Sequence, residues 1–85
     1  MKEFKYVITD PEGIHARPAG MLVAEAKKFN SSIKLTKGEK SGDCKKIFGL
    51  MGLGVKSGEE VSFTIEGDDE DTAFDAIREF MKENL

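Results

Sequence analysis

The chain has 85 residues, 39% hydrophobic and 34% charged, with a formal net charge of −3. This length provides for one core, so we expect a single domain over residues 1–85, and its acidic balance argues against a nucleic-acid partner, whose phosphates normally select basic surfaces. With one cysteine, Cys44, the chain can form neither an internal disulfide nor a Cys-based zinc site, and we expect Cys44 to be a semi-buried hydrophobic residue. The sequence shows no signal-peptide core and no membrane span, so we expect a cytoplasmic protein without membrane insertion.

The first half of the chain predicts a strand, a helix and a hairpin. Residues 3–9 alternate apolar and polar side chains as a half-buried strand does, and the turn sequence DPEG follows them. Apolar residues then recur at helical spacing over residues 16–29, where Pro18 falls in the first turn and does no harm. After a break at NSS, residues 33–37 and 40–44 flank the turn KGEK and predict two short strands.

The second half predicts a short helix, a strand and a longer helix. Residues 46–53 have apolar residues at helical spacing, but Gly49, Gly52 and the following Gly54 limit how far a helix extends. Residues 61–67 form a strongly alternating strand. Residues 68–71 then supply acidic N-caps and dipole-compensating charge for the last helix. The apolar residues of that helix are Ala73, Phe74, Ile77, Phe80 and Met81.

These elements follow in the order β-α-β-β-α-β-α. Long helices near both ends of a set of half-buried strands indicate an α+β fold in layers. We therefore expect one antiparallel sheet with its helices packed on one face.

The segment GIHARPAG, residues 13–20, contains the only histidine of the chain. His15 falls at the N-cap of the first predicted helix, where unpaired N–H groups and the helix dipole favour an anion. Histidine is not a preferred N-cap, since Ser, Thr, Asp or Asn there stabilises a helix by about 1 kcal/mol. A ring nitrogen at this place could accept a phosphoryl group. Alternatively, His15 is a turn residue or a buried, hydrogen-bonded core histidine.

Four neighbours bear on the same question. Arg17 adds a planar fork of hydrogen-bond donors, which lysine would not reproduce. A cation at a helix N-terminus is mildly unfavourable, so Arg17 calls for an anion or a carboxylate partner, unless it is only a solvated first-turn residue. Pro18 restricts the backbone of the first turn, and Gly13 and Gly20 keep bulk away from it. These residues alone leave the anion-site and structural interpretations equally open.

With these motifs in hand, the chain resembles the histidine-containing phosphocarrier (HPr) family of the bacterial phosphoenolpyruvate-dependent sugar phosphotransferase system. The resemblance covers essentially the whole chain, from GIHARPA through KKIFGLMGLGV, in the place of the family's second helix, to GDDEDTAFDAI. It implies an open-faced β-sandwich, in which three helices cover one face of a four-stranded antiparallel sheet.

The resemblance also implies a function and a set of site residues. Nδ1 of His15 would receive a phosphoryl group from phosphorylated Enzyme I and pass it to sugar-specific IIA domains. Arg17 would stabilise that group, and Ala16, Pro18 and the neighbouring backbone N–H groups would complete the cradle. The protein would be a carrier rather than an enzyme, with no cofactor and no metal, and we expect a monomer.

A docking surface for Enzyme I and the IIA domains follows from the same resemblance. Its six residues would be Gly20, Met21, Lys27, Ile47, Phe48 and Met51. Plain core packing is the alternative for Ile47 and Met51. Phe48 is expected to be exposed, because it falls off the apolar stripe of the short helix.

One position departs from the regulated members of the family. Many of them carry a regulatory serine where this chain has Lys46. Lysine cannot accept that phosphate, so we expect no control by HPr kinase at this site. Whether Ser41 or Ser57 takes over stays open.

Two further functions compete with sugar transport. The first is a regulator whose phosphorylation state signals to an enzyme or a transcription factor. The second is a carrier in a nitrogen-type or dihydroxyacetone-type phosphorelay. Neighbouring genes for sugar-specific permeases would favour transport. An independent hydrolase is disfavoured, because no Ser, Cys or second His pairs with His15.

Overall fold

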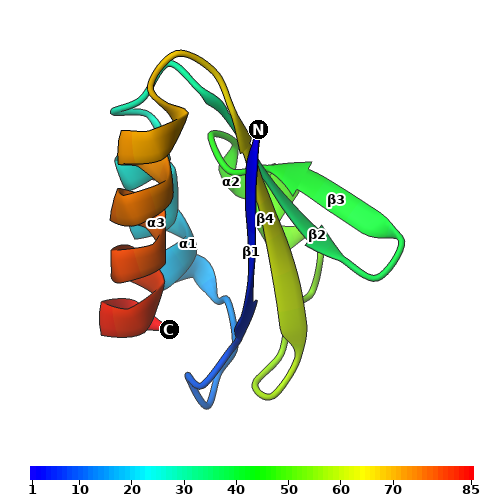
Figure 1. The fold of residues 1–85 in the computed structure, drawn as a ribbon. Coiled ribbons are helices and arrows are strands. Elements are labelled where there is room, and N and C mark those ends of the chain that lie inside the picture. Colours follow the sequence, from blue (N-terminus) through cyan, green and yellow to red (C-terminus); the bar gives the residue numbers. More distant parts are fainter.

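The computed structural model describes residues 1–85, with four strands and three helices in the predicted order (Figure 1). The elements are β1 (Lys2–Val7), α1 (Ala16–Ala26), β2 (Ser32–Lys37), β3 (Lys40–Asp43), α2 (Ile47–Met51), β4 (Glu60–Glu66) and α3 (Glu70–Asn84). All neighbouring strands pair antiparallel, in the order β1-β4-β2-β3. The α+β class and the four-stranded antiparallel sheet are therefore confirmed.

Alternation along the strands places one face of the sheet in the core. In β4, Val61, Phe63 and Ile65 are buried, and Ile33 and Leu35 of β2 are buried beside them. Across β1 and β4, Phe4 lies opposite Phe63, and the two rings stack with their centroids 4.8 Å apart. Aromatic cross-strand pairs of this kind stabilise a sheet beyond the area that they bury.

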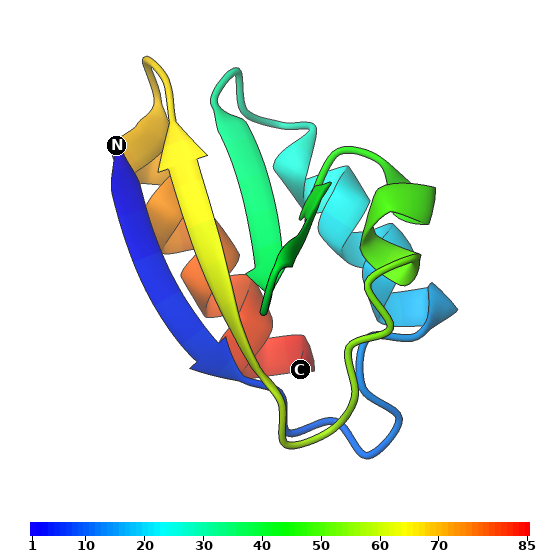
Figure 2. The ribbon, with the colours of Figure 1, turned by 90° about the vertical axis from the view of Figure 1, so that its right-hand side faces the viewer.

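The helices cover this face of the sheet. Figure 1 shows α1 and α3 side by side on one side of the strands. The short helix α2 packs against α1 and β3 near the edge of the sheet, as Figure 2 shows. The open-faced β-sandwich implied by the resemblance is therefore confirmed. No helix of this fold has the length and apolar composition needed to cross a bilayer.

Helix α1 ends three residues earlier than the periodicity predicts. It stops at Ala26 instead of residue 29, and the chain turns before it enters β2. The last turn tightens instead, because the N–H groups of Lys28 and Phe29 donate to the carbonyls three residues earlier. The chain beyond this turn is held by Asp69, whose carboxylate accepts hydrogen bonds from the main-chain N–H groups of Asn30 and Ser31, at 2.8 and 2.9 Å, and from the Ser31 hydroxyl. These donors lower the pKa of Asp69.

The expected capping role of the acidic segment before α3 is thereby corrected. Asp69 occupies the N-cap position, but its side chain makes no cap hydrogen bond within the helix. Its carboxylate joins the segment between α1 and β2 to the start of α3, while Glu70 and Asp71 supply acidic charge to the first turn as predicted.

Cys44 also differs from expectation, because it is fully buried rather than semi-buried. Burial raises the pKa of its thiol to about 12. Cys44 is therefore a packing residue with an unreactive side chain.

Candidate functional site

The loop of residues 8–15, here the His15 loop, is held at both ends. On one side, the main-chain N–H groups of Thr9 and Asp10 donate to the main-chain oxygen of Leu85 at 2.6 and 3.1 Å. On the other, Ile14 N–H donates to the carbonyl of Val55 at 3.1 Å. The loop that presents His15 is thus anchored to the end of α3 and to the segment before β4.

Gly13 allows the second of these contacts. Its φ is +69°, a region that favours glycine, and a Cβ at this position would lie 2.3 Å from the carbonyl oxygen of Val55. Any larger residue would push the loop away from its anchor.

His15 is the N-cap of α1, as predicted. Its backbone is extended, with φ −97° and ψ −178°, and its carbonyl accepts a hydrogen bond from Ala19 N–H at 3.0 Å. The imidazole makes no cap bond and is 34% exposed, so the alternative of a buried core histidine is wrong. Pro18 has no N–H, and those of Ala16 and Arg17 donate to no acceptor in the chain. Two backbone donors at the positive end of the helix dipole are therefore unpaired.

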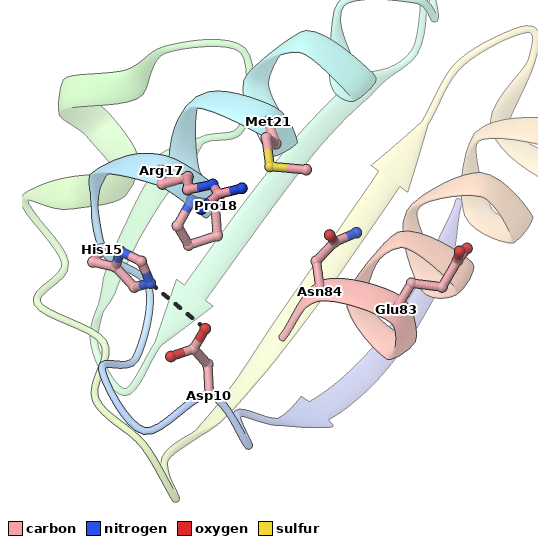
Figure 3. Close-up of a pocket in the computed structure, with 7 residues that line it drawn as sticks. All are labelled: Asp10, His15, Arg17, Pro18, Met21, Glu83 and Asn84. Atoms are coloured by element: carbon pink, nitrogen blue, oxygen red, sulfur yellow. Dashed lines mark ion pairs between the residues drawn. The ribbon is translucent and has the colours of Figure 1, made fainter.

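A pocket of about 250 Å³ lies beside the histidine, between the start of α1 and the end of α3 (Figure 3). Its lining residues are Asp10, His15, Arg17, Pro18, Met21, Glu83 and Asn84. The structure thus brings the predicted His15, Arg17 and Pro18 together at one pocket. Ala16 belongs to the same helical turn but does not line the cavity.

Arg17 is exposed and forms no ion pair within the chain. The carboxylate partner that a cation at a helix N-terminus calls for is therefore not supplied by the protein itself. Its guanidinium is free to bind an anion that enters the pocket.

Two acidic residues beside His15 were not identified from the sequence. Nε2 of His15 lies 3.5 Å from an oxygen of Asp10 and 3.4 Å from an oxygen of Glu12. Both belong to the turn DPEG, where acidic residues are expected in any turn, so the sequence did not indicate that they flank the histidine. Asp10, Glu12 and His15 are also the one group that offers three potential metal-ligand atoms, all within 4.8 Å.

Glu83 and Asn84 line the same pocket from α3. No local signal in the sequence relates them to His15, because their place depends on how the last helix returns across the sheet.

The six expected docking residues lie on α1, on α2 or directly after α1. Phe48 is 86% exposed, as predicted, and Met21 and Met51 are 44% and 40% exposed, so Met51 is not a core residue. Ile47 is half-buried against the core and faces α1 at Gly20, where an added Cβ would lie 3.8 Å from its Cδ1.

Lys27 is exposed directly after α1, and Lys46 is exposed at the N-cap of α2. The apolar residues of the docking surface are thus accompanied by lysines at the ends of both helices.

Comparison with known proteins identifies the family. The family model of the phosphorylation site of the HPr component of the phosphotransferase system matches residues 2–83. The chain belongs to the HPr family. It is 45% identical to a phosphocarrier protein HPr of Lysinibacillus sphaericus over 98% of this chain and 94% of that protein.

Solved HPr structures share the fold. The histidine-containing phosphocarrier protein of Mycoplasma superposes with a TM-score of 0.94 at 40% identity, over 96% of this chain and 93% of that one. HPr-C-His of Thermoanaerobacter tengcongensis gives a TM-score of 0.93 at 41% identity, over 98% and 93%. HPr proteins are phosphocarriers of the phosphotransferase system, which fits a protein that is not an enzyme and that interacts with the enzymes of this system.

Proposed function

We propose that Nδ1 of His15 receives a phosphoryl group from phosphorylated Enzyme I and passes it to sugar-specific IIA domains. One observation carries this proposal: the only histidine occupies the N-cap position of α1, part-exposed, immediately before two backbone N–H groups that have no acceptor. A phosphoryl group on the imidazole would meet these donors at the positive end of the helix.

The neighbouring residues have distinct roles in the proposed cradle. The N–H groups of Ala16 and Arg17 donate to the phosphoryl oxygens, and the guanidinium of Arg17 adds charge-assisted hydrogen bonds. Pro18 is buried, so the first turn of α1 keeps its shape while the group arrives and leaves. Neither a metal nor a cofactor takes part.

Transfer is a displacement at phosphorus. The Nδ1 lone pair attacks, the bond from phosphorus to the donor side chain breaks, and a bond from phosphorus to Nδ1 forms. The reverse displacement delivers the group to a IIA domain. The chain is itself the covalent intermediate of the relay, so in each cycle it docks first with Enzyme I and then with a IIA domain.

The docking surface serves both partners. Met21, Phe48 and Met51 offer exposed apolar side chains, Met21 lines the pocket itself, and α2 packs against α1. Lys27 adds positive charge at the edge. A monomer presents this surface freely, and we propose that state.

The test is incubation with Enzyme I and labelled phosphoenolpyruvate. We expect one acid-labile, base-stable phosphate per chain, located on His15 and abolished by His15→Ala. Label on a serine or an aspartate would contradict the proposal.

We propose that the chain is not regulated by HPr kinase at the start of α2. Lys46 stands exposed at the N-cap of α2, where regulated family members carry a phosphorylated serine. Phosphate there would place negative charge beside the exposed Phe48, whereas lysine keeps the same place positive. The chain would then transfer phosphate without responding to HPr kinase.

A further inference from the structure

We propose that Asp10, assisted by Glu12, is a positioning residue that keeps the proton of His15 on Nε2 and leaves the Nδ1 lone pair free to attack. The tautomer is a property of the unphosphorylated protein, whereas the consequence for transfer rests on the function proposed above.

Asp10 is held at three of its polar groups. Its N–H donates to the main-chain oxygen of Leu85 at 3.1 Å, and its carbonyl accepts from Gly13 N–H at 2.9 Å. One carboxylate oxygen, Oδ1, accepts from Glu12 N–H at 2.9 Å. The other, Oδ2, faces Nε2 of His15 at 3.5 Å, as Figure 3 shows. The carboxylate is thus oriented toward the imidazole before any partner arrives.

The two carboxylates differ in how strongly they can act. The side chain of Asp10 is 23% exposed, so solvent screens its charge only in part. Oε2 of Glu12 lies 3.4 Å from Nε2, but this side chain is 75% exposed and therefore well screened. Asp10 is the principal residue and Glu12 adds to it.

The contacts of the ring determine which nitrogen carries the proton. An ionised carboxylate only accepts hydrogen bonds, so two of them beside Nε2 favour Nε2–H in the neutral imidazole. Nδ1 forms no hydrogen bond or ion pair with the rest of the chain. The lone pair then resides on the nitrogen that the proposed transfer uses.

The same arrangement assists the displacement itself. As the bond from Nδ1 to phosphorus forms and the bond to the donor breaks, positive charge develops on the ring and spreads to Nε2–H. That charge appears within 3.5 Å of both carboxylates, which attract it. No proton leaves the ring during the step.

The first experiment measures the tautomer by 15N NMR on unphosphorylated protein, with EDTA present, at a pH where the imidazole is neutral. We expect Nε2–H to predominate in the wild type. In Asp10→Asn, the amide oxygen still accepts from Glu12 N–H, while the amide NH2 faces Nε2 as a donor. The population of Nδ1–H should therefore rise by about threefold or more.

Two variants serve as controls. Asp75→Asn makes the same change of charge at an exposed site of α3 that forms no ion pair, and it should leave the tautomer unchanged. Glu12→Gln should produce a smaller shift than Asp10→Asn. The amide signal of Gly13 reports whether the His15 loop keeps its fold in each variant.

The second experiment measures phosphoryl transfer from Enzyme I. Asp10→Asn should slow transfer by about tenfold or more without weakening docking, since a wrong tautomer at a reacting histidine costs up to about 10⁴-fold in rate. An unchanged tautomer in Asp10→Asn would overturn the positioning role whatever the kinetics show. A shifted tautomer in a chain that accepts no phosphate would leave that role intact and refute the proposed function.

Discussion

The substitution Phe48→Ala tests whether this side chain contributes to docking or to the stability of the fold. The ring is 86% exposed, so only about one-seventh of its surface is buried in the free protein. A phenylalanine buries about 200 Å² when it is fully enclosed, and about 25 cal/mol is gained per Å², so Phe48→Ala removes about 0.7 kcal/mol of burial. We therefore expect its free energy of unfolding to fall by less than about 1 kcal/mol.

Phe63 provides the matched control. It is the same residue type, fully buried and stacked on Phe4, so Phe63→Ala should cost about 3 to 5 kcal/mol. Urea unfolding followed by circular dichroism measures both values. The comparison keeps the chemistry of the substitution constant and changes only its place in the fold.

Binding should show the opposite pattern. An exposed aromatic at the centre of an interface typically contributes about 2 kcal/mol or more, so Phe48→Ala should weaken the affinity for Enzyme I by about 30-fold. Calorimetric titration of Enzyme I with the folded variant measures the loss. An unchanged Kd, or an unfolding free energy lowered as much as by Phe63→Ala, would refute the assignment of Phe48 to the docking surface.

Three further predictions follow from the pocket, from α2 and from the junction of α1 with α3. Arg17→Lys should slow phosphoryl transfer by about tenfold or more while shifting the thermal midpoint little, because lysine lacks the guanidinium fork; normal transfer would leave Arg17 a solvated residue. HPr kinase with ATP should leave the natural chain unmodified and should phosphorylate the Lys46→Ser variant. Mass spectrometry measures the modification, and phosphoserine on the natural chain would contradict this prediction. Lys46→Asp should slow phosphoryl transfer from Enzyme I, because it reverses the local charge. The hydrogen bonds of Ser31 and Asn30 lower the pKa of Asp69 in the folded protein, so its carboxylate stabilises the fold above the unfolded pKa of about 3.8, and this stability is lost as pH falls through the lower folded pKa. The unfolding free energies of wild type and Asp69→Asn should therefore converge on acidification. A difference that stays constant with pH would contradict the linkage.

Much of the site was predictable because its signals are local. A histidine placed just before an apolar period of 3.6 is an N-cap, and the structure confirms that position for His15. The exposure of Phe48 follows in the same way from its place off the apolar stripe of a short helix. Such inferences need only neighbours within one or two turns of the chain.

The surroundings of His15 required the tertiary structure. The sequence identifies the acidic residues of DPEG only as turn residues, and only the structure of the anchored loop shows that Asp10 and Glu12 flank Nε2. The anchor is the main-chain oxygen of Leu85, which accepts from the Thr9 hydroxyl across a sequence separation of 76 residues. No periodic pattern encodes a contact between segments so far apart.

The sequence by itself determined the order of the elements, the alternating faces of β1, β2 and β4 and the place of the histidine at a helix N-terminus, because these depend on side-chain periodicity and on the missing hydrogen bonds of a helix end. Only the tertiary structure decided the strand order β1-β4-β2-β3, the early end of α1 and the full burial of Cys44. The turn that follows α1 is held by a hydrogen bond between Asn30 and Asp69, which are 39 residues apart. Helical periodicity favours continuing past Ala26, but the main-chain donors of Asn30 and Ser31 bond to a carboxylate that only the folded protein brings to them, and not to carbonyls of a longer helix.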